Sequence, residues 1–243
     1  GAKAAPDGYT MTVAYVGTLA INPHLYRDAG FDPLKEFAAV TRGTLEAWVL
    51  VVHPSLPVHS VKELAALAKR HPGQLTFASS ASGTQLVGEL FKQATGTDIL
   101  HVPYKGAGPA VIDLLAGNVQ IMYSNPTAAV PHVRSGRLRG LAVTGRKRLD
   151  ALPDLPTGVE AGFPTLDVLG WYGVVVPAGT PPSIVTKLNT DLVSALNSPD
   201  VRERMKALGQ ELSPSTPGEF QEQIRNDYAM WGKIVRASGV KAD

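Results

Sequence analysis

Short β-branched, apolar runs alternate with helical patterns along most of this chain, and that alternation limits its fold more than any other feature of its sequence. The strands predicted from these runs are Thr10–Val16, Trp48–Val52, Leu75–Ala78, Ile99–Val102, Val119–Tyr123, Leu138–Thr144 and Gly173–Val176. Several of the runs are almost continuously apolar, which is typical of strands covered on both faces. The sequence therefore predicts an α/β fold with mainly parallel sheets.

Helices are predicted between the strands because their starts carry capping signals. Ser60 and Glu63 form a capping-box pattern at the start of Ser60–Arg70, and several later helices open with Ser or Thr followed by Pro. The further predicted helices are Gln85–Ala94, Pro109–Ala116, Ala128–Ser135, Ser183–Leu196, Pro199–Leu208 and Pro217–Ala237.

The distribution of these elements predicts two lobes. The segment Leu75 to Thr144 repeats strand, loop and helix, whereas Ser183 to Ala237 is almost wholly helical. Two similar segments, WVLVV before Pro54 and GWYGVVVPAGTPP around Trp171, flank the middle of the chain and suggest two hinge strands. We predict a discontinuous first lobe of residues 1–53 and 172–243, and a second lobe of residues 54–171.

Composition excludes several classes of protein. The formal net charge is only +2 with mixed signs throughout, so there is no basic stripe for nucleic acid. Cysteine is absent, which excludes disulfides and thiolate catalysis. No apolar run approaches the roughly 20 residues that cross a bilayer. Gly1 to Gly8 lack the pattern of a secretory signal, so we expect a soluble chain whose signal, if it is exported, is not included.

Catalytic motifs are also missing from the sequence. There is no G-x-S-x-G elbow, no G-x-x-x-x-G-K-[ST] loop, no H-E-x-x-H and no G-x-G-x-x-G after a strand. The six histidines are scattered, and we interpret His101 and His132 as structural. We expect no metal, no cofactor and no catalysis. An α/β enzyme acting on a carboxylate stays open as an alternative, because a nucleophile and a base can meet in space.

The most informative loop lies directly after one predicted strand and directly before a helix. It carries Ser79, Ser80, Ser82, Gly83 and Thr84. Unpaired backbone N–H groups and hydroxyls here would meet the positive end of a helix dipole, which suits a carboxylate or a phosphate. A bulky residue in place of Gly83 should then block the ligand. The alternative is a polar turn in which Ser82 or Thr84 only caps the helix.

Two further loops occupy the same position in successive strand–helix units. Tyr104, Lys105 and Gly106 follow one strand, and Asn125 follows the next. Gly106 would allow the backbone to approach a ligand, Lys105 would add positive charge, and Tyr104 would offer an aromatic wall. Ligands collect at the carboxyl ends of strands in open α/β sheets, so we expect these loops to point into one crevice.

A loop after the first predicted strand is the candidate from the other lobe. Thr18 and Asn22 lie in this segment and would reach a ligand from the first lobe, although Asn22 before Pro23 is also a common turn residue.

Taken together, these segments resemble the Bug-type extracytoplasmic solute receptors of tripartite tricarboxylate transporters. The matching text is AAPDGYT at 4–10, GTLAINPHLY at 17–26, DPLKEFAAV at 32–40, FASSASGT at 77–84, HVPYKGAGPA at 101–110, SGRLRGLAVT at 135–144, LPDLPT at 152–157 and VVPAGTP at 175–181. The blocks follow the family's order and cover nearly the whole chain.

The resemblance implies a two-lobed Venus-flytrap fold of the type II periplasmic-binding-protein class. A small carboxylated metabolite, whether dicarboxylate, amino acid or aromatic acid, would be held by amides, hydroxyls and bridging waters, and would be captured by closure of a cleft. The implied binding segments are Thr18–Asn22, Ser79–Thr84, Tyr104–Gly106 and Asn125.

The resemblance implies that the receptor lies in the periplasm and that its partners are the membrane components of the transporter. The receptor is expected to be a monomer. A sensor that reports to a membrane signalling partner shares this pocket and stays open as an alternative. Family members begin with a strand and a glycine-rich loop that have no counterpart in this sequence. The first lobe is therefore expected to lack its N-terminal strand and helix here.

Overall fold

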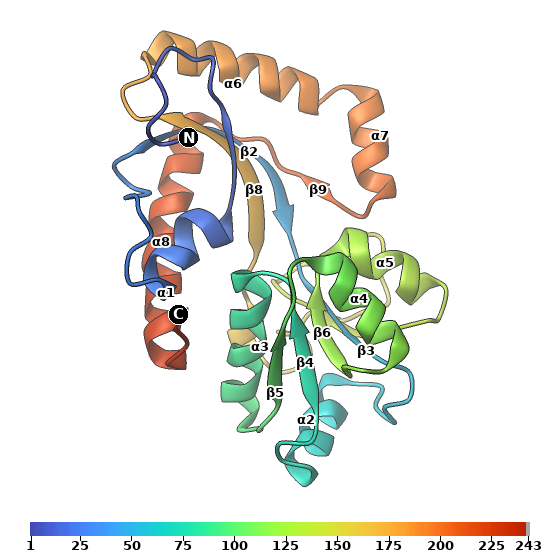
Figure 1. Cartoon of the computed structure of the whole chain (residues 1–243). Helices are drawn as coiled ribbons and strands as arrows, with labels where there is room; N and C mark the ends of the chain where they lie inside the picture. Colours follow the sequence, from blue (N-terminus) through green and yellow to red (C-terminus); the bar gives the residue numbers. More distant parts are fainter. Residues whose placement is uncertain (242–243) are drawn as a thin grey trace. The chain divides into compact units, whose positions relative to one another are not determined.

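The computed structural model describes residues 1–241 and forms two compact units (Figure 1). One unit comprises Gly1–Leu45 together with the segment that begins at Gly170, and the other comprises Glu46–Leu169. This division differs from the predicted one at residues 46–53 and 170–171. The difference arises because strand β3 (Val49–Val52) hydrogen-bonds with strands of the middle unit.

The middle unit contains a five-stranded sheet with the order β5-β4-β6-β3-β7. Its other strands are β4 (Thr76–Ser79), β5 (Leu100–Pro103), β6 (Ile121–Ser124) and β7 (Arg139–Val143). β4 runs parallel to both β5 and β6. β3 runs antiparallel to β6 and β7.

The prediction of mainly parallel sheets is therefore wrong for half of this sheet's pairings. Strand–helix–strand alternation implies parallel neighbours only where successive strands lie side by side. β3 is instead inserted between β6 and β7, which are both distant from it in sequence.

Helices cover both faces of the middle sheet. They are α2 (Val61–Arg70), α3 (Ser82–Thr95), α4 (Ala107–Ala116) and α5 (Pro126–Arg134), with a short 3₁₀ turn, η2 (Pro164–Leu166). Ala78 and Met122 belong to a buried cluster with residues of α4 and α5. Phe77 points to the opposite face, where Gly88 of α3 leaves room for its ring. Each predicted strand and helix overlaps an observed one.

The discontinuous unit contains a four-stranded sheet with the order β1-β8-β2-β9. Its elements are β1 (Thr12–Tyr15), β2 (Phe37–Glu46), β8 (Gly170–Pro177), β9 (Glu211–Leu212), α6 (Pro182–Leu196), α7 (Pro199–Ala207) and α8 (Pro217–Ser238). β1 is antiparallel to β8, and β2 is antiparallel to β9, so this sheet also departs from the parallel prediction.

The long helix α8 anchors the start of the chain in this unit. Gly17–Ile21 forms a single π-helical stretch, η1, followed by the short helix α1 (Asn22–Leu25). His24 of α1 lies 2.9 Å from the Tyr228 carbonyl through Nε2, and its ring occupies the space that a side chain at Gly232 would need. Among residues 1–241, no helix has both the length and the apolar character that crossing a membrane requires.

The prediction of a loop at Thr18–Asn22 is wrong, because this segment is helical. The alternative interpretation of Asn22 as a turn residue before Pro23 is also wrong, because Pro23 lies in the first turn of α1, where proline is well tolerated.

Candidate functional site

The carboxyl ends of three parallel strands meet at one edge of the middle sheet. β5, β4 and β6 are neighbours, and each leads through a short loop into α4, α3 and α5 respectively. The Tyr104 N–H donates to the Ser79 carbonyl at 2.9 Å and so joins two of the loops directly. The structure therefore places the predicted loops of this unit side by side, at the edge where such sheets gather ligands.

The loop before α3 is held together by Thr84. Its Oγ1 accepts hydrogen bonds from the N–H groups of Ser80 (3.1 Å) and Ala81 (3.2 Å), and donates to the Ala81 carbonyl at 2.9 Å. The Thr84 side chain is buried. Its hydroxyl is thus fully used inside the loop, which fixes the direction in which the chain enters the helix.

The start of α3 is left with unused donors. The N-cap residue is Ala81, whose methyl group cannot accept a hydrogen bond, and the first intrahelical bond runs from the Gln85 N–H to the Ala81 carbonyl at 3.0 Å. The N–H groups of Ser82 and Gly83 come earlier in the helix than Gln85 and therefore have no acceptor within it. The Ser82 Oγ is buried and has no hydrogen-bond partner among the described residues. These donors lie at the positive, N-terminal end of a 14-residue helix, an arrangement that favours an anion.

A serine and a histidine meet beside this loop. Ser79 Oγ lies 2.7 Å from His101 Nε2, and the Ser79 side chain is buried. The His101 ring packs against Phe77 with 4.9 Å between ring centroids. Burial lowers the pKa of His101 below its usual value of 6.5 and Lys92 lowers it further, while Glu89 opposes them. The imidazole is therefore neutral at pH 7.

This pair has the residue types of the nucleophile and the base in a catalytic triad. Catalytic versions need a third group that orients the imidazole. In the part of the chain that the structure describes, no carboxylate hydrogen-bonds to His101, so the orienting group is missing. His101 was predicted to be structural, and its contact with Ser79 was not predicted. A contact between residues 22 apart depends on the register of β4 and β5, which no local pattern reveals.

The loop before α4 uses its polar side chain internally. The Tyr104 hydroxyl donates to Asp113 Oδ2 at 2.7 Å, and Asn118 Nδ2 donates to Asp113 Oδ1 at 3.1 Å. Burial and the hydrogen bond with Asp113 raise the pKa of Tyr104 to about 12. Tyr104 therefore presents its ring rather than a free hydroxyl, while Lys105 is exposed.

Gly106 is the N-cap of α4 and its backbone requires glycine. Its φ is +115°, a conformation that residues with a side chain rarely adopt. A Cβ built there would have no neighbour within 4 Å, so the backbone beside the helix start is open to approach.

The loop before α5 is capped by its own asparagine. Asn125 Oδ1 accepts hydrogen bonds from the Ala128 N–H at 3.1 Å and from Thr127 Oγ1 at 3.2 Å. Among residues 1–241, the Asn125 amide nitrogen donates to no other group. On the preceding strand, the Tyr123 side chain is 2% exposed and its hydroxyl has no partner among residues 1–241. Tyr123 was not a predicted site residue, since an apolar strand pattern gives no signal of a buried free hydroxyl.

The two predicted site residues of the discontinuous unit lie on helical backbone. Thr18 is half-buried in η1. Asn22 opens α1, with its N–H donating to the Gly17 carbonyl and its carbonyl accepting from the Tyr26 N–H at 3.0 Å.

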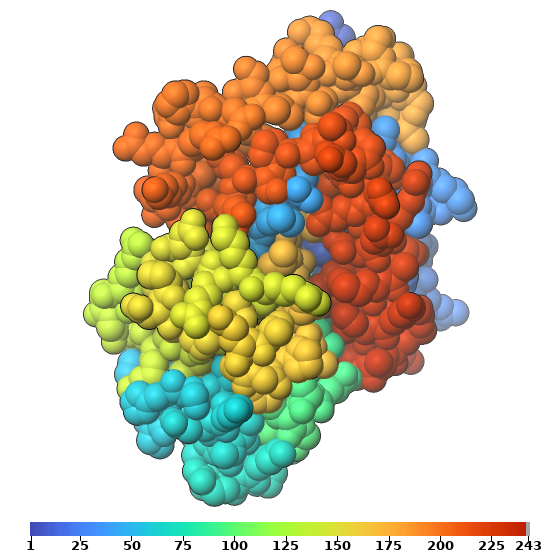
Figure 2. Space-filling model, turned by 180° about the vertical axis from the view of Figure 1, so that it is seen from behind, coloured from blue at the N-terminus to red at the C-terminus, as the bar shows by residue number. Residues whose placement is uncertain are grey.

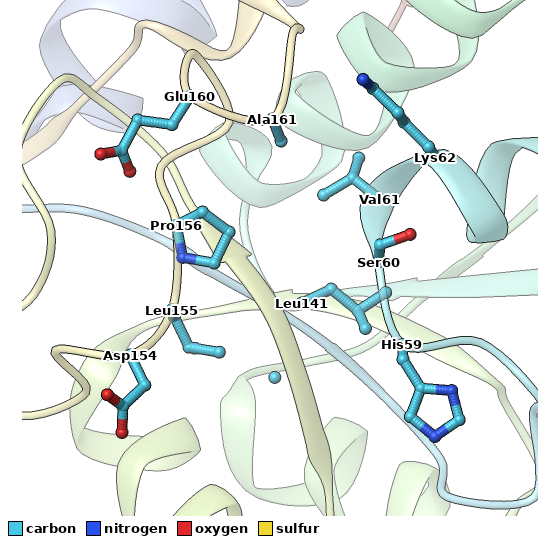
Figure 3. Close-up of a pocket in the computed structure, with 11 residues that line it drawn as sticks. His59, Ser60, Val61, Lys62, Leu141, Asp154, Leu155, Pro156, Glu160 and Ala161 are labelled. Carbon is cyan, nitrogen blue, oxygen red and sulfur yellow. The ribbon is translucent and has the colours of Figure 1, made fainter.

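A separate pocket of about 370 Å³ lies elsewhere in the middle unit, between the start of α2 and the segment 154–161 (Figure 3). In Figure 2 this segment, in yellow, lies on the surface beside the cyan α2. The pocket floor is apolar, formed by Val61, Leu141 and Leu155. On its rim, Glu160 is already paired with Arg148, 2.9 Å away. None of the predicted site residues lines it.

One family model and several known proteins match this chain. The family model described as tripartite tricarboxylate transporter family receptor matches residues 1–240. Protein BugT of Bordetella pertussis is 37% identical over 243 residues, which cover 99% of this chain and 74% of BugT.

Solved structures of similar sequence share the fold. An R. palustris protein solved with adipate has a TM-score of 0.92 and 37% identity, over 99% of this chain and 81% of that one. The periplasmic binding protein BugD has a TM-score of 0.90 and 32% identity, over 100% and 82% of the two chains. MatC from Rhodopseudomonas palustris, solved with malate, has a TM-score of 0.88 and 30% identity, over 96% and 81%.

Proposed function

Because the chain belongs to the Bug-type receptor family of tripartite tricarboxylate transporters, we propose that it captures a small carboxylated metabolite and delivers it to the membrane components of such a transporter. As a member of this family it is a periplasmic solute-binding protein with the two-lobed α/β fold. We expect it to act as a monomer.

The observation that carries the proposal is the uncapped start of α3. Ser82 and Gly83 offer backbone N–H groups, and Ser82 adds a buried hydroxyl without a partner. A ligand carboxylate accepts these donors and gains the favourable field of the helix. In this scheme Thr84 shapes the loop, and the hydroxyls of Ser79 and Ser80 complete the donor set.

The neighbouring loops contribute the rest of the proposed contacts in this unit. The Asn125 amide donates to ligand oxygens, the Gly106 backbone allows close approach, and the Tyr104 ring packs against the carbon chain. Lys105, which is exposed, adds a positive field rather than a fixed contact. Thr18 and Asn22 stay predicted ligand contacts of the discontinuous unit.

The ligand class follows from the small charge of these loops. Lys105 is the one ionised side chain among the proposed contacts of the middle unit, so neutral donors must balance the ligand's charge. One or two carboxylates are better matched than three. Relatives solved with adipate and with malate support the same class.

Catalysis is not part of the proposed function. The Ser79–His101 pair lacks an orienting carboxylate within the described chain, so the serine has no activated base behind it. Candidate acids incubated with the protein should remain unchanged.

A binding screen with one matched pair of variants tests the proposal. Adipate, malate and a panel of mono-, di- and tricarboxylates are assayed by thermal shift and calorimetry, since a ligand that binds the folded state raises apparent stability. Gly83→Val should abolish binding of the acids that the unmodified protein binds. Gly218→Val places the same side chain at the equivalent second position of α8 and should leave affinity unchanged.

Two results would count against the proposal. If no acid in the panel stabilises a folded protein, the carboxylate receptor assignment fails. If acids bind equally well to both variants, the anion does not sit at the start of α3.

A further inference from the structure

The Ser79 hydroxyl has a single proton, and its direction depends on which atom is the donor in the hydrogen bond with His101. The 2.7 Å contact between Ser79 Oγ and His101 Nε2 is short enough for only two arrangements. Either Ser79 donates to an unprotonated Nε2, or a protonated Nε2 donates to Ser79. In the first case Ser79 presents lone pairs to its surroundings, and in the second its own O–H is free to donate.

A carboxylate at the start of α3 distinguishes between these arrangements. Ser79 is the last residue of β4, three positions before Ser82 and four before Gly83. Their N–H groups are donors, so an anion that they hold is repelled by serine lone pairs and attracted by a serine O–H. Only the form with a proton on Nε2 makes Ser79 part of the same donor set.

We propose that His101 is a positioning residue that donates its Nε2–H to Ser79 and thereby turns the Ser79 hydroxyl proton toward the ligand carboxylate. This inference rests on the proposed function, in which the start of α3 holds that carboxylate. His101 would then affect specificity without touching the ligand. Because its Nε2–H occupies the Ser79 oxygen, the loop presents only hydrogen-bond donors to the ligand, which favours ionised acids over their amides and esters.

The surroundings of His101 support a neutral donor that gains a proton when an anion binds. Burial disfavours the imidazolium form. The charged groups that act on it both come from α3: Glu89 and Lys92, which form an ion pair of 3.0 Å. The facing residues of β4, Phe77 and Ser79, do not ionise at neutral pH. Charge near His101 is therefore balanced until a carboxylate arrives, and the carboxylate then favours the protonated ring.

Nitrogen NMR of the imidazole tests the inference without any ligand. Protein labelled with ¹⁵N-histidine is compared with a His101→Gln variant to assign the His101 signals. We expect the ring to be neutral at pH 7.5 with its proton on Nε2. A proton on Nδ1, with Nε2 as acceptor, would overturn the inference whether or not any acid binds.

Adipate affinity in two variants supplies the second test. Glutamine retains an amide donor, so His101→Gln should bind adipate within about threefold of the unmodified protein at pH 7.5. His101→Leu has no donor, and the loss of one oriented hydrogen bond should weaken adipate about tenfold. Equal weakening in both variants would indicate a purely structural role and overturn the inference.

The pH profile separates positioning from packing. Affinity of the unmodified protein for adipate should rise relative to that of His101→Gln as the pH falls from 7.5 toward 6, because ligand binding favours proton uptake by His101. The ligand's own ionisation affects both proteins equally and cancels in this ratio. A constant ratio across that range would contradict the inference.

Failure of the inference and failure of the proposed function give different results. If adipate does not bind the unmodified protein, the function assignment is challenged, while the NMR measurement still decides the direction of the Ser79–His101 hydrogen bond. If adipate binds and the proton is on Nδ1, the function stands and the role of His101 falls.

Discussion

Two helices of the middle unit, α2 and α3, begin in opposite ways. At α2, Ser60 Oγ accepts the Glu63 N–H at 3.1 Å and the Glu63 carboxylate accepts the His59 N–H at 2.7 Å. At α3, the N-cap position is Ala81 and a serine stands one position later, with its buried hydroxyl unpaired. Both starts contain a serine, so its position, not its presence, distinguishes a closed helix start from one that keeps its donors for a ligand.

The start of α3 is expected to be less stable than the start of α2. A side-chain cap is worth about 1 kcal/mol, and an unpaired buried hydroxyl costs free energy as well. α3 lacks the first and has the second, whereas α5 in the same unit is capped by the Asn125 side chain. A bound carboxylate repays both deficits, so ligand binding and helix capping are alternatives at this position.

A side-chain cap introduced at the start of α3 should change ligand affinity strongly. Ala81→Asp places a carboxylate at the N-cap, where it accepts the helix N–H groups, and the Thr84 bonds to the Ala81 backbone can remain. We expect the free energy of unfolding to rise by about 0.5–2 kcal/mol. Affinity for adipate should fall more than about hundredfold, because the new charge both occupies the donors and repels the ligand.

Urea denaturation and calorimetry on the same preparations measure both quantities. Ala81→Ser is the neutral control: it should stabilise α3 with a smaller loss of affinity. Unchanged affinity in Ala81→Asp would mean that the start of α3 is not the anion site, and the comparison with α2 would lose its functional meaning.

Truncation of one serine at each helix start should produce smaller and opposite effects. Ser60→Ala removes the cap of α2 and should lower the free energy of unfolding by about 1 kcal/mol without changing affinity. Ser82→Ala should weaken adipate about three- to tenfold, because one donor is lost, while stability stays the same or rises. If both variants lose only stability, the two helix starts are equivalent and Ser82 is an ordinary polar residue.

Particular residues show what the sequence can and cannot predict here. Ser60 and Glu63 predicted the cap of α2 because all of its partners lie within four residues. The order of strands and loops placed Ser79, Tyr104 and Asn125 at one edge, because strand ends and helix starts are local signals.

Features that depend on distant partners were missed. Strand β2 was not predicted, since its Arg42 and Thr41 are satisfied by Ser213 and Ser215, more than 170 residues away. The Ser79–His101 contact and the internal use of the Tyr104 hydroxyl by Asp113 also require the assembled fold.

A weaker effect is expected on the acid sensitivity of the folded protein. Burial lowers the pKa of His101 in the folded protein below its unfolded value of about 6.5. As the pH falls below that value the unfolded chain gains a proton that the folded chain resists, so stability is full above it and declines from pH 7 toward pH 5. The lowered pKa of His24 contributes to this loss of stability with the same sign.

His101→Gln should reduce the dependence of the free energy of unfolding on pH, measured by urea denaturation at a series of pH values. Ser60→Ala should lower the free energy of unfolding equally at every pH. If the slope of His101→Gln matches that of the unmodified protein, the imidazole is not desolvated in solution, and the acid sensitivity belongs to His24 or to other groups away from the α3 loop.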